Sequence, residues 1–131
     1  MSEQNTQRPG EKPNNDWMLR ALSLSGSGFP VILTTAAGLI AGDIVGEVEY
    51  LETLQNSLAD GWGERAEPLR TMFAPAIENA TRLPQEHIHL RNAKLYTSTG
   101  ILEVGVNGLW RGRLEQVIGH SIGRVTATAV A

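Results

Sequence analysis

The sequence has 131 residues, 41% of them hydrophobic and 19% charged, with no cysteine and a formal net charge of −3. This length fits one domain with one ordinary core. The lack of cysteine excludes disulfides, thiolate metal sites and cysteine nucleophiles, and the acidic balance argues against a nucleic-acid module held by a large basic surface.

The first fifteen residues are polar, with no apolar residue after Met1. Such a segment cannot bury enough surface to offset the entropy of ordering it, so we expect a disordered tail over residues 1–15. It lacks the apolar stretch of a secretory signal, and no run in the chain approaches the roughly 18 apolar residues of a membrane helix. We therefore expect a cytoplasmic protein that does not contact membranes.

A short helix is predicted from Trp17 to about Ser23, ended by the glycines that follow it. A strand from Leu19 to Ser25, in which leucines alternate with serines, is the competing interpretation. We favour the helix, for which Asp16 supplies an N-cap.

The clearest local signal is a β-hairpin. Residues 29–35 are rich in β-branched side chains, Ala37-Gly38 predicts a tight turn, and residues 39–50 alternate between two faces. Gly42 and Gly46 in the second strand predict bends or close approaches of another backbone, as in small barrels.

A helical insertion is predicted at about residues 51–80. Leucines at helical spacing begin it, Gly61 and Gly63 interrupt it, and residues 64–80 resume the helical pattern. Pro68 fits the first turn of the second stretch, whereas Pro75 should kink or end it.

Three or four antiparallel strands are predicted after residue 85. Residues 87–96 alternate with a phase shift at Asn92, and residues 101–106 and 109–117 are joined by Asn107-Gly108, a strong hairpin signal. Gly119 predicts a turn before the last strand at residues 122–128, and residues 129–131 should be frayed.

This order predicts one mainly β, α+β domain over residues 16–128. Short strands with glycine bends favour a small antiparallel barrel of the SH3 or Sm-like kind, or a strongly bent sheet, with helices covering one side. A plain α+β sheet with helices on one side is the alternative. A doubly wound nucleotide-binding fold is disfavoured because strands do not alternate with crossover helices.

Catalytic and metal-binding residues carry only weak signals. His87 and His89 would face one side of a strand, but a metal site needs a third ligand and no second half-motif is visible. Glu47 and Glu49 would share a strand face, where two buried carboxylates can share a proton. No nucleophile elbow or phosphate-binding glycine loop occurs, so we predict no catalytic residue, cofactor or metal site.

Contact with a partner is the more promising role for individual residues. Trp62 lies between two glycines in a predicted loop; it either folds back over the core, which we favour, or is offered to a partner. Trp110 lies beside arginines, as in single-strand nucleic-acid platforms, although arginines paired with glutamates are the simpler interpretation. The candidate interaction residues are Trp62, Arg91, Lys94, Arg111, Arg113 and Arg124.

Two stretches stand out as a pair: Ile-His-Leu-Arg-Asn-Ala-Lys-Leu-Tyr at residues 88–96 and Leu-Trp-Arg-Gly-Arg-Leu at residues 109–114, with Gly123-Arg124 beyond them. Together they resemble the C-terminal half of the bacterial gas vesicle accessory protein U family. The first half of the chain is similar more loosely, so the resemblance covers roughly residues 16–128.

The resemblance implies a non-enzymatic cytoplasmic protein that assists vesicle assembly or clustering, with no catalytic residue or cofactor to carry over. Its partners would be further copies of itself, the vesicle shell or other gas vesicle proteins. The chain differs from the family pattern in its uncharged C-terminal residues, where a Ser/Lys-rich end is expected. Two alternatives stay open: an Sm-like oligomeric or RNA-binding module, and a small metal-binding protein or enzyme.

Overall fold

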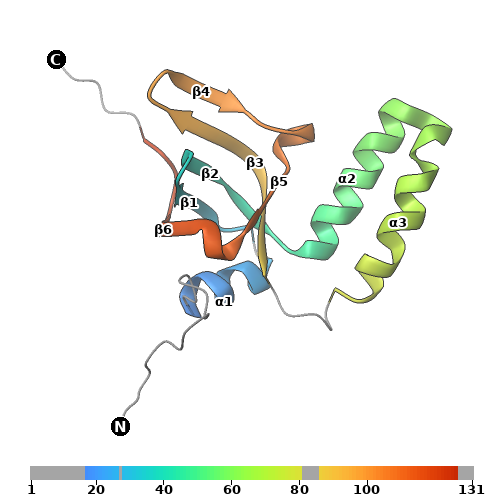
Figure 1. Ribbon diagram of the computed structural model, residues 1–131, viewed down its shortest axis with the longest axis horizontal. Helices are drawn as coiled ribbons and strands as arrows, with labels where there is room; N and C mark the ends of the chain where they lie inside the picture. Colours follow the sequence, from blue (N-terminus) through green and yellow to red (C-terminus); the bar gives the residue numbers. More distant parts are fainter. Residues whose placement is uncertain (1–16, 27, 81–85, 127–131) are drawn as a thin grey trace, which may run out of the picture.

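The computed structural model describes residues 17–26, 28–80 and 86–126. The predicted tail at residues 1–15 and the end at residues 129–131 lie outside these described residues. The fold is α+β, with a six-stranded antiparallel sheet accompanied by helices (Figure 1). In chain order the elements are α1 (Trp17–Ser25), β1 (Pro30–Thr35), β2 (Gly38–Val45), α2 (Glu47–Trp62), the 3-10 helix η1 (Gly63–Ala66), α3 (Glu67–Glu78), β3 (His87–Thr97), β4 (Gly100–Glu103), η2 (Val106–Gly108), β5 (Trp110–Arg113), η3 (Leu114–Gln116) and β6 (Val117–Ile122).

The strands follow the order β4-β3-β2-β1-β6, and β5 also pairs with β3. The long strand β3 holds both partners on one edge, because its first half pairs with β5 and its second half with β4. In the part of the chain that the structure describes, neither β4 nor β5 pairs with β6. The sheet is therefore open, and the predicted closed SH3- or Sm-like barrel does not form.

The sheet is nevertheless strongly curved. β5 and β6 lie on opposite edges, separated by four strand spacings, which is about 19 Å in a flat sheet. Only η3 joins them, and a fully extended chain from Arg113 to Val117 reaches about 14 Å. A flat sheet cannot satisfy this connection, which agrees with the bent-sheet form of the prediction.

The core lies between α1 and the concave sheet. Helix α1 contributes Leu19, which is almost fully buried, and packs near β2 and β3. The predicted helix at this position is confirmed; Gly26 follows it with a φ of 57°. The other buried members of the cluster come mainly from the strands: Val31, Leu33, Ile40, Ile44, Ile88, Leu90, Ala93, Leu114 and Val117.

The second strand of the hairpin is shorter than predicted. β2 ends at Val45 and α2 begins at Glu47, so the predicted strand positions Val48 and Tyr50 are helical. Glu47 and Glu49 lie in the first turn of α2, where the helix dipole favours negative charge. Gly42 does mark the predicted close approach, since an added Cβ would lie 3.0 Å from a backbone oxygen of β3.

The C-terminal strands also differ from the sequence prediction. Asn92 adopts a φ of 56° and shifts the phase of β3, as predicted, so that Ala93 faces the core. Asn107 and Gly108 both have positive φ, yet they do not form the predicted hairpin, because β4 and β5 each pair with β3. Gly119 lies inside β6 and makes no turn, and β6 already ends at Ile122.

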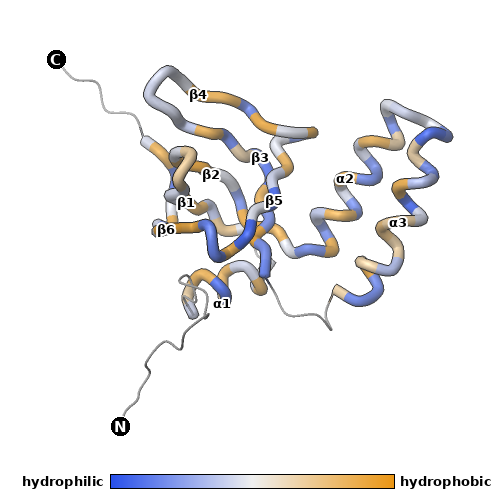
Figure 2. The backbone as a smooth tube through the Cα atoms, in the orientation of Figure 1, coloured by the Kyte–Doolittle hydropathy of each residue, from blue (hydrophilic) through white to orange (hydrophobic). Residues whose placement is uncertain are grey.

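The predicted insertion exists, beginning at Glu47, before the predicted start at residue 51. α2 passes through Gly61 and ends at Trp62, with Gly63 as its C-cap. α3 carries Pro68 in its first turn and continues past Pro75. The α2–α3 pair stands beside the sheet and does not cover its face (Figures 1 and 2). Of the described helices, none is long and apolar enough to cross a bilayer.

Candidate functional site

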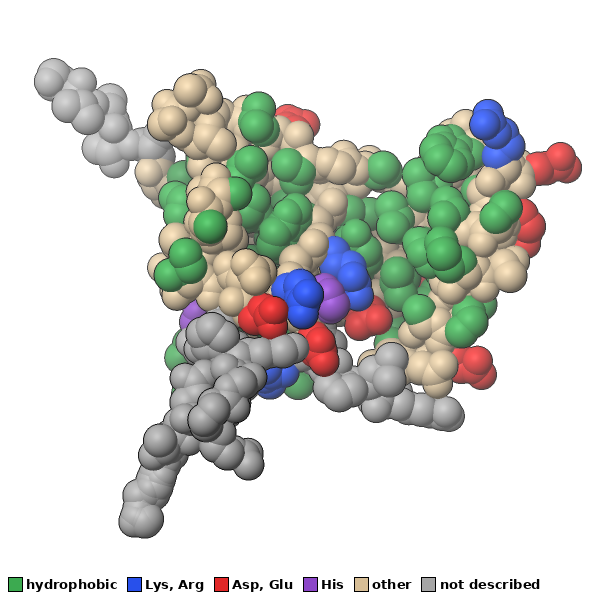
Figure 3. All heavy atoms as spheres, viewed as in Figure 1, with side chains coloured by type: hydrophobic (Ala, Val, Ile, Leu, Met, Phe, Trp, Pro, Cys, Tyr) green, Lys and Arg blue, Asp and Glu red, His purple; other side chains and the backbone are tan. Residues whose placement is uncertain are grey.

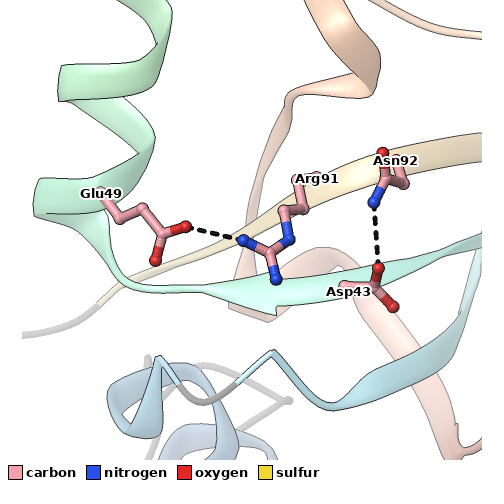
Figure 4. Close-up of polar contacts among 4 residues, drawn as sticks. All are labelled: Asp43, Glu49, Arg91 and Asn92. Atoms are coloured by element: carbon pink, nitrogen blue, oxygen red, sulfur yellow. Dashed lines mark hydrogen bonds and ion pairs between the residues drawn. The ribbon is translucent and has the colours of Figure 1, made fainter.

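Asp43 on β2 is a buried carboxylate that joins three segments of the chain. The residue is only 7% exposed. The Asn92 side-chain amide donates to Asp43 Oδ2 at 3.1 Å (Figure 4), and Arg124 Nη1 lies 3.2 Å from Asp43 Oδ1. Both carboxylate oxygens therefore have partners.

Local backbone features bring these partners together. The positive φ of Asn92 makes the irregularity at which β2 and β3 slip in register, and this places the amide over Asp43. Gly123 follows β6 and donates its N–H to the carbonyl oxygen of Pro30 at 2.8 Å, which holds the next residue, Arg124, near the start of β1. The arrangement stabilises the junction of strands β1, β2 and β3.

A groove with a volume of about 980 Å³ lies beside this junction. Its walls come from β4 and η2 on one side and from the residues after β6 on the other, over a floor of β1, β2 and β3. Lys94 and Glu103, which face each other across β3 and β4, also line it. Asp43 and Arg124 neutralise each other there, so the groove offers a mixed polar surface and not a concentrated charge of either sign.

His89 on β3 is fully buried between Tyr50 and Arg111. Arg111 Nε donates to His89 Nε2 at 3.1 Å, and the Tyr50 ring centroid lies 4.7 Å from the imidazole centroid. Because an arginine can only donate, the neutral ring must carry its proton on Nδ1, which has no hydrogen-bond partner in the structure. Burial lowers the pKa of His89 to about 3, and the positive charge of Arg111 acts in the same direction.

The weak catalytic and metal signals do not converge. Burial and the nearby arginines lower the pKa of His87 as well, but among the described residues no group of three or more His, Cys, Asp or Glu is placed to hold a metal ion. Glu47 and Glu49 do not share a strand face, because both belong to α2. Glu49 instead forms an ion pair with Arg91 at 2.9 Å (Figure 4).

Of the six candidate interaction residues, two, Lys94 and Arg124, line the groove. Trp62 is 55% exposed at the end of α2, so the favoured placement over the core is wrong. Three arginines have carboxylate partners, and the fourth, Arg111, bonds His89. Lys94 is exposed and makes no ion pair with any described residue. The three arginine–carboxylate pairs are Arg91–Glu49, Arg113–Glu115 and Arg124–Asp43.

Exposed apolar side chains are the feature that the sequence interpretation missed. Figure 3 shows them over the sheet and over the α2–α3 pair. They occur in most elements. The sequence does contain these residues within the predicted strands and helices, but it does not show that their side chains are exposed. The large exposed ones are Trp17, Met18, Leu24, Phe29, Leu39, Trp62, Met72, Ile101, Leu102, Val106, Ile118 and Ile122.

A family model described as "Gas vesicle protein GvpU-like" matches residues 16–125. No curated protein and no solved structure matches the chain.

Proposed function

Because the chain belongs to the GvpU-like gas vesicle protein family, we propose that it is a non-enzymatic accessory protein of the cytoplasm. It assists vesicle assembly or clustering by contacting the vesicle surface and further copies of itself. The family match covers nearly all of the described residues, so the proposal concerns the whole domain.

The exposure of large apolar side chains on separate elements carries this proposal. Trp17 and Ile118 are each 74% exposed, and they lie on α1 and β6. Trp62 and Ile101 are exposed on α2 and β4. Several weak apolar contacts on one small domain give multivalent binding, which can link large particles without a single tight interface.

The ionisable residues support a binding role over a catalytic one. Arg91 and Arg124 pair with carboxylates of distant segments, Glu49 and Asp43, and Arg113 pairs with its near neighbour Glu115. His89 is buried and neutral, with its ring bonded to Arg111. These groups stabilise the domain in the arrangement described and do not converge on a common point in the groove.

Co-flotation with purified gas vesicles tests the proposal. We expect the protein to rise with the vesicles and to increase their light scattering, whereas an unrelated acidic protein of similar size stays in solution. Apolar contacts are little screened, so clustering should persist at about 0.5 M salt. A protein that stays monomeric and leaves vesicles dispersed would contradict the proposal.

A further inference from the structure

The α2–α3 pair has an incomplete core. No residue of α3 is buried, although α3 is a helix of 12 residues, and its main neighbours are α2 and η1. Helices in folded proteins gain most of their stability by burying an apolar face. The apolar face of α3 is therefore covered only in part by the described chain.

The two helices present apolar residues at helical spacing. On α2, Leu54, Leu58 and Trp62 recur every fourth residue and so share one face. On α3, Leu69 and Phe73 are half-buried and Met72 is 59% exposed. The space-filling view shows apolar side chains gathered over both helices (Figure 3). Exposed Trp and Met side chains are both typical of surfaces that bind helices.

The same segment is strongly acidic. Residues 47–78 contain seven carboxylates and only two basic residues, Arg65 and Arg70. Glu49 pairs with Arg91, but most of the others make no ion pair with any described residue. These unpaired carboxylates are Glu52, Asp60, Glu64, Glu67 and Glu78.

We propose that the α2–α3 pair is the docking surface for a basic amphipathic helix of a partner protein. The partner's apolar face covers Trp62, Met72 and Phe73, and its basic residues meet the unpaired carboxylates of residues 47–78. This rests on the proposed function and adds to it the chemistry of one partner.

Charge decides between this partner and a second copy of the chain. Two α2–α3 pairs brought together would repel each other, and the arginines of the sheet are mostly engaged already. The surface also favours a helix over a strand, because a helix pair offers apolar side chains and no free strand edge.

A synthetic helix provides the test. The probe is a fluorescent peptide of about 18 residues, slightly longer than α2, with leucines on one face and lysines on the other. Anisotropy measures its binding to the full-length protein. The matched control peptide carries glutamates in place of lysines.

Four variants at exposed positions localise the binding. Trp62→Ser and the double variant Glu64→Lys/Glu67→Lys should each weaken peptide binding by about tenfold or more, as expected for an aromatic anchor and its complementary charges. Ile118→Ser on β6 and Glu103→Lys on β4 are the matched controls and should change it by less than about twofold. Circular dichroism confirms that each variant is folded.

The other results overturn the proposal. The leucine–lysine peptide does not bind saturably, or the glutamate peptide binds equally well. Alternatively, the control variants weaken peptide binding as much as the test variants, or Trp62→Ser loses self-association but keeps peptide binding. Co-flotation of the wild-type protein is measured in parallel. Flotation without peptide binding overturns the docking surface alone, and peptide binding without flotation overturns the proposed function alone.

Discussion

Two buried polar side chains, Asp43 and His89, show how single residues organise this domain. Asp43 is paired on both oxygens, so its burial costs little net free energy, and it fixes where β2, β3 and the segment after β6 meet. His89 satisfies only one ring nitrogen in the described structure. Protonating the buried ring would place a second positive charge beside Arg111, so the cost of burying His89 rises when the pH is low enough to protonate free histidine.

We predict that acid destabilises the protein through His89. In the unfolded chain the ring takes up a proton near pH 6.5, whereas burial and Arg111 keep the folded pKa at about 3. The unfolded state therefore binds more protons between these values, and stability falls as the pH drops from about 6.5 to about 3, by on the order of a few kcal/mol. Urea unfolding at a series of pH values measures this loss.

His89→Gln is the control for that measurement. A glutamine oxygen can still accept the bond from Arg111 but does not titrate, so the variant should show a shallower loss of stability over the same range. An NMR titration in which the His89 ring protonates near pH 6.5 in the folded protein would contradict the explanation.

Sequence alternation could identify which residues share a strand face, but it could not show that His89 is buried. His87 and His89 alternate with Ile88 and Leu90, and this alternation predicts only that both rings face one side of the strand. His89 is buried because α2 brings Tyr50 over it and Arg111 caps it. These are contacts between distant segments, and no local pattern contains them.

At the scale of elements, glycines show which turns and crossings depend on the absence of a side chain. Gly108 has a φ of 69°, and an added Cβ would lie 2.8 Å from the backbone nitrogen of Ala93. Gly112 similarly leaves room for the Trp110 ring, which an added Cβ would overlap. Gly61 in α2, in contrast, has nothing within 4 Å.

We predict opposite effects for two glycine-to-alanine substitutions. Gly108→Ala should destabilise the protein by about 2 kcal/mol or more, because both the backbone conformation and the space exclude a side chain. Gly61→Ala should stabilise it by roughly 0.5–1 kcal/mol, because alanine favours the helix. Thermal and urea unfolding check both; equal effects in the two variants would show that the close approach of η2 to β3 is wrong.

The boundaries between elements were harder to predict than their types. The sequence favoured the short first helix, the first hairpin and the insertion, and all three exist. The alternation through residues 46–50 extended the second strand too far, because the same residues also fit the first turns of a helix. Asn107-Gly108 has the backbone of a hairpin turn, but β3 is long enough to take β4 and β5 on one edge, and that pairing decided the topology.

For the whole molecule, the main contrast is between a well-packed curved sheet and a lightly packed helix pair. The core residues of β1, β2 and β3 are almost fully buried, whereas α3 has no buried residue. Local opening should follow that difference, because segments with few buried apolar contacts open at lower free energy.

We predict that backbone amides of α3 exchange with deuterium much faster than those in the centre of β2 and β3. Hydrogen-exchange mass spectrometry at neutral pH measures this directly. Binding of the leucine–lysine peptide should slow exchange in α3 and leave the sheet unchanged. Uniform protection across α3 and the sheet in the free protein would show that the helix pair is packed as firmly as the core.

The overall class was predictable because composition and periodicity report on local structure, but whether the sheet closes depends on pairing between its edges. β4 and β5 share one edge and β6 forms the other, and only the short η3 connects the two. The sequence predicts curvature through its glycines, and the three-dimensional pairing determines that the strands stop short of a barrel.

The pairing of β1 with β6 has a consequence for synthesis on the ribosome. β1 is among the first elements to emerge, while its outer partner is the last strand made. The edge of β1 that pairs with β6, which includes Val31 and Leu33, therefore has no partner strand while the helices and the middle strands are translated. The nascent chain is most exposed to mispairing during this interval, and cellular holdases that shield extended apolar segments would act on it there.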